Sequence, residues 1–64
     1  MTSLLTEIER CLRRRKIAPS RFGREAARDP RLVFDLRNGR EPRPRTQARV
    51  MAFIAAELAG ELRQ

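Results

Sequence analysis

The chain has 64 residues, enough for one domain, and a domain of this size buries only about 60% of the surface that its unfolded form exposes. It contains one cysteine, Cys11, and no histidine. This composition excludes an intramolecular disulfide and a zinc site of the usual spacing. With no histidine, one cysteine and no pair of carboxylates expected around a cleft, the sequence also offers little for acid–base or nucleophilic catalysis. We therefore expect a protein that is not an enzyme, needs no cofactor and is stabilised by apolar packing.

Charge is the most informative bulk property. Fifteen basic residues against eight acidic ones give a net charge of +7, and fourteen of the fifteen are arginine. Residues 10–49 hold fourteen of the basic residues and four of the acidic ones, a net charge of +10 between two mildly acidic ends. Such a basic middle predicts a polyanionic partner. No apolar run approaches the roughly 18 residues of a membrane-spanning helix, so we expect no membrane partner and a place in the cytoplasm, associated with the nucleoid.

The first half of the chain predicts two helices. Ser3 is expected to cap a helix over residues 4–15. Its apolar face is marked by helical spacing of Leu5, Ile8 and Leu12. Pro19 is well placed as the first residue of a second, short helix over residues 19–27.

Two more helices are predicted in the second half. Asp29 followed by Pro30 indicates the start of a third helix that ends near Arg37, where Asn38-Gly39 accepts left-handed backbone. Pro44 is expected to open the last helix. Its inner stripe consists of Val50, Phe53, Ile54 and Leu58. Glu57 interrupts that stripe, so we expect the helix to turn or fray near its end. With no period-2 alternation in the sequence, the fold class is all-α.

The second and third helices have the spacing of a helix-turn-helix centred on residues 19–38. At 100° per residue, Val33 and Leu36 point to one side of the third helix, with Leu32 beside them. The opposite side carries a different set, namely Arg31, Phe34, Asp35 and Asn38. One side is therefore expected in the core, and the other is free for recognition.

This stretch resembles the lambda-repressor-like (Cro and phage repressor) DNA-binding domains, and the likeness is strongest from Pro19 to Arg45. The fifth position of the motif is small in that family, here Gly23. The fourth, eighth, fifteenth and eighteenth are apolar, here Phe22, Ala26, Val33 and Leu36. The ending Leu36-Arg37-Asn38-Gly39, followed by a basic loop with prolines, is typical of phage repressors. The chain departs from the pattern at the usual turn glycine and on the third helix, at Ala27, Pro30, Leu32 and Phe34.

The resemblance implies a small four-to-five-helix domain in which residues 1–64 form one unit that binds double-stranded DNA and regulates transcription. Residues 30–37 would be the recognition helix in the major groove. Contacts to the DNA backbone would come from Ser20, Arg21, Arg28, Asn38, Arg40, Arg43 and Arg45. Arg31 would read a guanine, and Phe34 would lie against a thymine methyl. Asp35 would accept from a cytosine or hold Arg31 one turn earlier; we favour the second role.

Other interpretations stay open. The same fold could serve as a protein-interaction adaptor, in which Leu32, Phe34 and the basic loop contact an acidic polymerase subunit or a toxin. RNA is a weaker fit, because the sequence has no tyrosine or tryptophan and no predicted sheet for base stacking. A homodimer on DNA is expected, since one such module buries little surface. Its candidate contacts are Met51, Leu58 and Leu62. The alternative is that Leu58 packs on the first helix and Leu62 frays.

Overall fold

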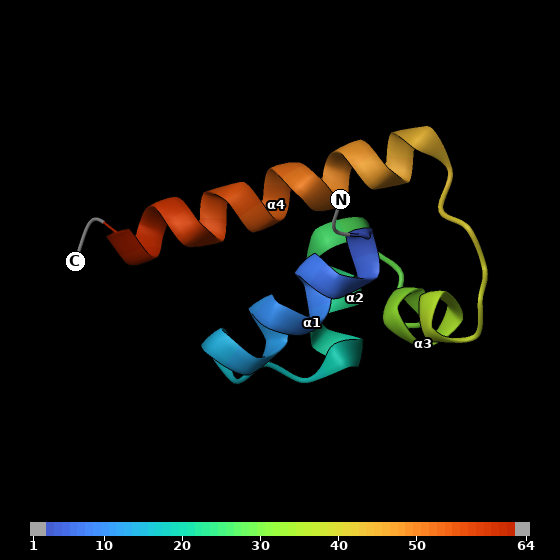
Figure 1. Ribbon diagram of the computed structural model, residues 1–64, viewed down its shortest axis with the longest axis horizontal. Helices are drawn as coiled ribbons and strands as arrows, with labels where there is room; N and C mark the ends of the chain where they lie inside the picture. The colour runs from blue at the N-terminus through green and yellow to red at the C-terminus, as the bar shows by residue number, and fades with distance from the viewer. Residues whose placement is uncertain (1–2, 63–64) are drawn as a thin grey trace.

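Four α-helices make up the computed structural model shown in Figure 1, which describes the backbone of residues 3–62 and the side chains of residues 3–60. They are α1 (Leu4–Arg15), α2 (Pro19–Ala27), α3 (Leu32–Arg37) and α4 (Pro44–Leu62). The described residues contain no strand, so the predicted all-α fold is confirmed. The first three helices lie on one side of α4, and the C-terminal part of α4 reaches beyond them (Figure 1).

Local capping chemistry sets the ends of α1 and α2, as the sequence predicts. The Ser3 hydroxyl accepts a hydrogen bond from the Thr6 N–H at 3.1 Å, and Lys16 ends α1 in a left-handed conformation with φ of 55°. Pro19 opens α2, where its missing N–H is not needed. At the other end of α2, Arg28 is also left-handed, with φ of 56°. Both helices therefore have the predicted bounds.

The start of α3 is a correction to the sequence prediction. Residues 29–31 form a turn, in which the Asp29 carboxylate accepts from the Arg31 N–H at 3.0 Å and the Asp29 carbonyl accepts from the Leu32 N–H at 3.1 Å. The helix begins at Leu32, after Pro30 rather than at it. Pro30 has no N–H to donate, so the hydrogen bonds of the turn pass over it to the next two residues. At the C-terminal end only Gly39 takes a positive φ, of 92°.

The last helix also corrects an expectation, because α4 runs on to Leu62 without turning. Glu57 does not interrupt the packing. Its half-buried carboxylate lies 3.1 Å from the guanidinium of Arg15 at the end of α1. An acidic residue in the inner stripe is thereby matched by a basic residue of another helix, and the stripe continues to a half-buried Leu58.

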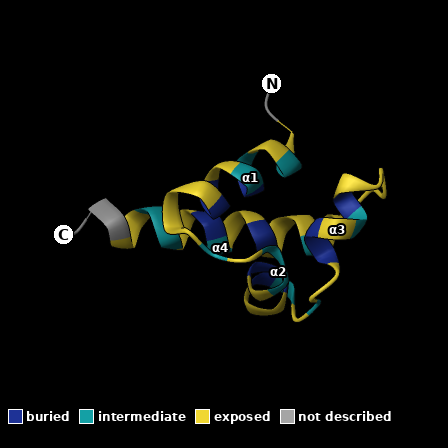
Figure 2. Ribbon diagram, turned by 90° about the horizontal axis from the view of Figure 1, so that it is seen from below, coloured by how far each residue is buried: buried dark blue, intermediate teal, exposed yellow. Residues whose placement is uncertain are grey.

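The core draws one fully buried side chain from each helix, namely Ile8, Phe22, Val33 and Val50. Around them lie other buried apolar residues, and the ring of Phe53 meets that of Phe22 edge-on at 5.4 Å between centroids. Figure 2 shows this buried set, in dark blue, on the sides of the helices that face one another. No buried polar or charged residue occurs among the described residues. The charged and polar side chains of the described residues therefore lie at least partly at the surface.

Candidate functional site

A close approach joins α2 to the turn before α3. A Cβ atom placed on Gly23 would overlap the carbonyl oxygen of Asp29 and lie 3.1 Å from the Cβ of Leu32. The Asp29 N–H also donates to the Gly23 carbonyl oxygen at 3.1 Å. This explains why the position requires glycine, as the resemblance implies for the fifth position of the motif. It fixes α3 against α2 at a set distance.

The turn itself differs from what the motif predicts. Ala27, at the usual glycine position, is still helical, and the left-handed residue is Arg28, one position later. An L-amino acid in that conformation costs free energy that glycine avoids. Arg28 is exposed there, so its guanidinium projects from the turn into solvent.

The two sides of α3 are divided as the periodicity predicts. Leu32, Val33 and Leu36 are buried in the core, whereas Arg31 and Asn38 are exposed. Phe34 has 45% of its surface exposed. Leu32 is therefore unavailable to a protein partner, which corrects the adaptor interpretation at that residue. Phe34 remains an open apolar surface on the outer side of the helix.

Asp35 has a different partner from the one we favoured. Its carboxylate lies 3.2 Å from Nη1 of Arg40, in the loop after α3, and not on Arg31. The loop folds back because Gly39 is left-handed and the Arg40 N–H donates to the Asp35 carbonyl oxygen at 3.0 Å. Asp35 thus orients the loop, and Arg31 keeps its guanidinium unpaired within the described part of the chain.

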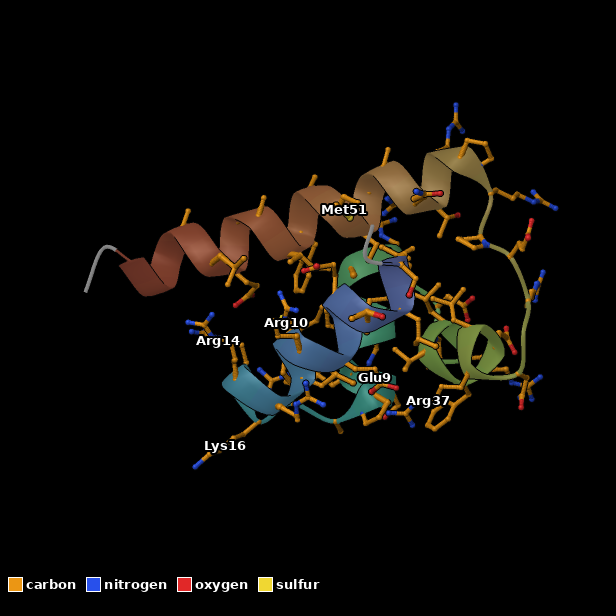
Figure 3. The ribbon with its side chains drawn as sticks, in the orientation of Figure 1. Glu9, Arg10, Arg14, Lys16, Arg37 and Met51 are labelled. Carbon is orange, nitrogen blue, oxygen red and sulfur yellow. The ribbon has the colours of Figure 1, made fainter. Side chains whose placement is uncertain are left out.

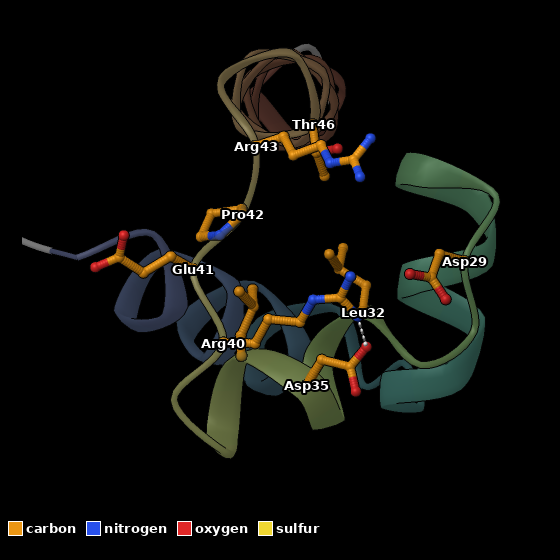
Figure 4. Close-up of a pocket in the computed structure, with 9 residues that line it drawn as sticks. Asp29, Leu32, Asp35, Arg40, Glu41, Pro42, Arg43 and Thr46 are labelled. Atoms are coloured by element: carbon orange, nitrogen blue, oxygen red, sulfur yellow. Dashed lines mark hydrogen bonds and ion pairs between the residues drawn. The ribbon is translucent and has the colours of Figure 1, made fainter.

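A cleft of about 270 Å³ lies between α3, the loop and the start of α4. Figure 4 shows it with the Arg40–Asp35 pair on one side and Arg43 on the other. Its floor is the buried edge of α3, and its rim is charged. The lining consists of Asp29, Leu32, Asp35, Leu36, Arg40, Glu41, Pro42, Arg43 and Thr46. The cleft brings the turn before α3 and the first turn of α4 to the same part of the surface, although the sequence separates them.

The arginines fall into two groups according to whether a carboxylate neutralises them. Five ion pairs occur within residues 3–60, at Arg10–Glu7, Arg15–Glu57, Arg21–Glu25, Arg37–Glu9 and Arg40–Asp35. In the same range, six exposed arginines around the turn and the start of α4 form no ion pair: Arg24, Arg28, Arg31, Arg43, Arg45 and Arg49. Uncompensated positive charge therefore occurs on α2, in the turn before α3 and at the start of α4, where Arg43 lines the cleft.

Sequence reasoning missed one pair on the recognition helix. Arg37 donates from Nε to Oε2 of Glu9 at 2.8 Å and from Nη2 to Oε1 at 2.7 Å, which joins α3 to α1. Figure 3 shows the two side chains pointing toward one another. The hydrogen bonds from Arg37 hold the pKa of the Glu9 carboxyl below its ordinary value, and the pKa of Arg37 is raised in turn. The two residues are far apart in the chain, so no local pattern could reveal the pair.

The remaining predicted residues lie in varied settings. Ser20 is half-buried in the first turn of α2, and Arg21, next to it, is engaged by Glu25 at 2.7 Å. Of the dimer candidates, Met51 lies on α4, where Figure 3 labels it. It is 47% exposed. Leu58 is half-buried against the core. The side chain of Leu62 lies outside the described residues.

Comparisons of the chain with models of known protein families, with curated proteins and with solved structures give no match. Among the described residues, no three histidine, cysteine or acidic side chains are grouped as a metal ion would require. Within the same residues, no helix has the length and apolar character needed to cross a membrane.

Proposed function

We propose that this protein is a sequence-specific double-stranded DNA-binding regulator of transcription, with α3 in the major groove. One observation carries the proposal. The α2–α3 unit, closely packed at Gly23, leaves one side of α3 exposed, and the turn before α3 and the start of α4 carry arginines that no carboxylate of the described residues neutralises. A short helix flanked by free guanidinium groups suits a duplex, because phosphates line both edges of the groove that the helix would enter.

The exposed side of α3 would read bases. Arg31 is exposed at the start of the helix, and its free guanidinium has the geometry to donate two hydrogen bonds to O6 and N7 of a guanine. Phe34, three residues later, would meet the methyl group of a thymine. Asp35 is paired with Arg40. We therefore propose that Asp35 orients Arg40 toward the DNA backbone and does not contact a cytosine.

Anchoring to phosphates would come from the surrounding residues. The largest contribution to affinity would come from Arg28, Arg43 and Arg45, because none of them has to break an ion pair with a described carboxylate before it binds a phosphate. Arg21 and Arg40 would share their guanidinium groups between a carboxylate and a phosphate. The other expected backbone contacts are Ser20 and Asn38, by hydrogen bonds. Such contacts fix the register of α3 on the duplex and carry no sequence information.

We also propose that the protein acts as a homodimer on DNA in the nucleoid. A single module of this type buries only roughly 600–1,000 Å² on DNA, which is small for a tight and specific complex. Met51, the exposed large apolar residue on α4, is the candidate contact that this structure supports best. Leu58 packs against the core, so only the exposed part of its side chain is available for a dimer contact.

The proposal is tested by selection of duplexes from a random-sequence library with the purified protein. Titration of the selected duplex and of a scrambled duplex then gives the specificity ratio. Arg31→Ala should reduce the difference in binding free energy between the two duplexes by about 1–3 kcal/mol. Arg43→Ala should weaken binding to both duplexes alike. No enrichment in the selection, or equal losses for both variants on both duplexes, would contradict the proposal and favour the adaptor interpretation, for which Phe34 is the remaining exposed surface.

A further inference from the structure

The bidentate pair between Glu9 and Arg37 has an unusual place, because it connects α1 to the exposed side of the recognition helix. Both oxygens of the carboxylate are used, at 2.7 and 2.8 Å, and this fixes the plane of the guanidinium group. A single-point contact between these side chains would leave the plane free to rotate. The pair joins α3 to α1, so it is separate from the contact that holds α2 and α3 together.

Phe34 lies directly beside this fixed group. The Cζ atom of Arg37 is 6.0 Å from the centroid of the Phe34 ring, within the range of a cation–π contact. The ring is nevertheless 45% exposed, and it and Met51 are the large apolar side chains left exposed among the described residues. One part of the ring therefore meets the guanidinium, while the rest is held open to solvent in a defined position.

The guanidinium group of Arg37 donates to Glu9 from two nitrogens, so it is not directed at a guanine. A phenyl ring has no hydrogen-bond donor or acceptor to offer to a base edge. What it can recognise in the major groove is the methyl group on C5 of a pyrimidine. Cytosine and uracil lack this group, whereas thymine and 5-methylcytosine carry it.

We propose that Glu9 and Arg37 are positioning residues that hold Phe34 as a reader of the pyrimidine 5-methyl group, an inference that rests on the proposed function. The preferred duplex then contains a thymine at the Phe34 position, and 5-methylcytosine can replace it there. Loss of one methyl contact should reduce affinity about four-fold, the equivalent of leaving one such group exposed to water.

The positioning role predicts two effects of opposite sign for Glu9→Gln. Removing the carboxylate frees Arg37 for phosphates and removes a negative charge near the DNA, so affinity for any duplex should rise. Phe34 loses its fixed neighbour, so discrimination between a methylated and an unmethylated pyrimidine should fall below about two-fold, against four-fold in the wild type. A variant that is simply less well folded would lose both.

The experiment uses the selected duplex with uracil in place of thymine at each position in turn, followed by cytosine and 5-methylcytosine at the sensitive position. The proteins are wild type, Phe34→Ala, Phe34→Leu and Glu9→Gln. Glu25→Gln is the matched control, because it removes the negative charge from another hydrogen-bonded Arg–Glu pair, with Arg21, that does not involve Phe34. Circular dichroism melting verifies that each variant is folded at the temperature of the titration.

We expect one position at which the wild type prefers thymine to uracil and 5-methylcytosine to cytosine. Phe34→Ala should abolish both preferences, and Phe34→Leu should keep most of each. Glu9→Gln should weaken the preferences while Glu25→Gln leaves them unchanged. A wild type that binds the selected duplex specifically but has no such position would overturn the inference and leave the proposed function standing. If Glu9→Gln and Glu25→Gln have the same preference for the methylated pyrimidine, the positioning role is wrong. A wild type that selects no duplex at all would refute the proposed function itself.

Discussion

Two helical glycines of this chain should respond in opposite directions to the same substitution. In Gly23→Ala, the new methyl group overlaps the backbone carbonyl of Asp29 and presses on Leu32. A backbone carbonyl cannot move aside as a flexible side chain can, so the start of α3 must shift away from α2. Overpacking of this kind costs about 3 kcal/mol at the upper end of its usual range. Alanine also favours the helix by about 1 kcal/mol, which leaves a net loss of about 2 kcal/mol in the free energy of unfolding.

Gly60→Ala is the control, because a Cβ atom at Gly60 meets nothing within 4 Å. There only the gain in helix propensity applies, about 1 kcal/mol. In a domain of this length, 1 kcal/mol shifts the melting temperature by roughly 4–8 °C. Thermal unfolding followed by circular dichroism should therefore show Gly23→Ala melting about 8–16 °C below the wild type and Gly60→Ala melting above it. If both variants are stabilised alike, the close approach of α2 to the turn is wrong, and with it the geometry of the helix-turn-helix.

Three further predictions concern charge and conformation. Arg28→Gly and Lys16→Gly should each raise the free energy of unfolding by about 1 kcal/mol, because glycine adopts the left-handed conformation without a steric penalty. Under the proposed function, Arg28→Gly should also weaken binding to DNA in a titration. If about five phosphates are neutralised per protomer, log affinity should fall with log salt at a slope of roughly −4 to −5, and a slope near zero would contradict the phosphate contacts. Arg37 lowers the pKa of Glu9 from its ordinary 4.5, so the pair stabilises the fold above pH 4.5 and loses this effect as the pH falls through the folded pKa. Urea titrations should therefore show the stabilities of the wild type and Glu9→Gln converging at acid pH. A difference that stays constant with pH would be inconsistent with the pair.

Where the chain uses local signals, the sequence is a sufficient guide to the fold. The ends of α1 and α2 depend on Ser3 and Pro19, which act on their own backbone within one turn. The buried side of α3 follows from its period, and the need for glycine at position 23 follows from the resemblance. The sequence pattern misplaces the start of α3, because two local rules compete there. Proline favours a first helical turn, but Asp29 forms a turn that skips the proline.

The surface is harder to predict, because side-chain pairs depend on how helices are placed in space. The sequence pattern predicts that Glu57 disturbs α4, and only the position of Arg15 on α1 shows why it does not. The preference for Arg31 as the partner of Asp35 rested on helical spacing, and Arg40 is closer because the chain reverses at Gly39. Contacts of this kind decide which arginines are free. Composition alone gives the net charge and not its distribution among partners.

The pairing of carboxylates with particular arginines has a consequence for how copies of the protein meet. The five ion pairs engage much of the acidic surface of residues 3–60, so little free negative charge is left to attract the basic surface of a second copy. With a net charge of +7, two free copies repel each other at low salt. A polyanion placed between them cancels that repulsion. Under the proposed function, DNA is then both the target of the protein and the condition for its self-association, and a dimer should be observed only while the duplex is bound.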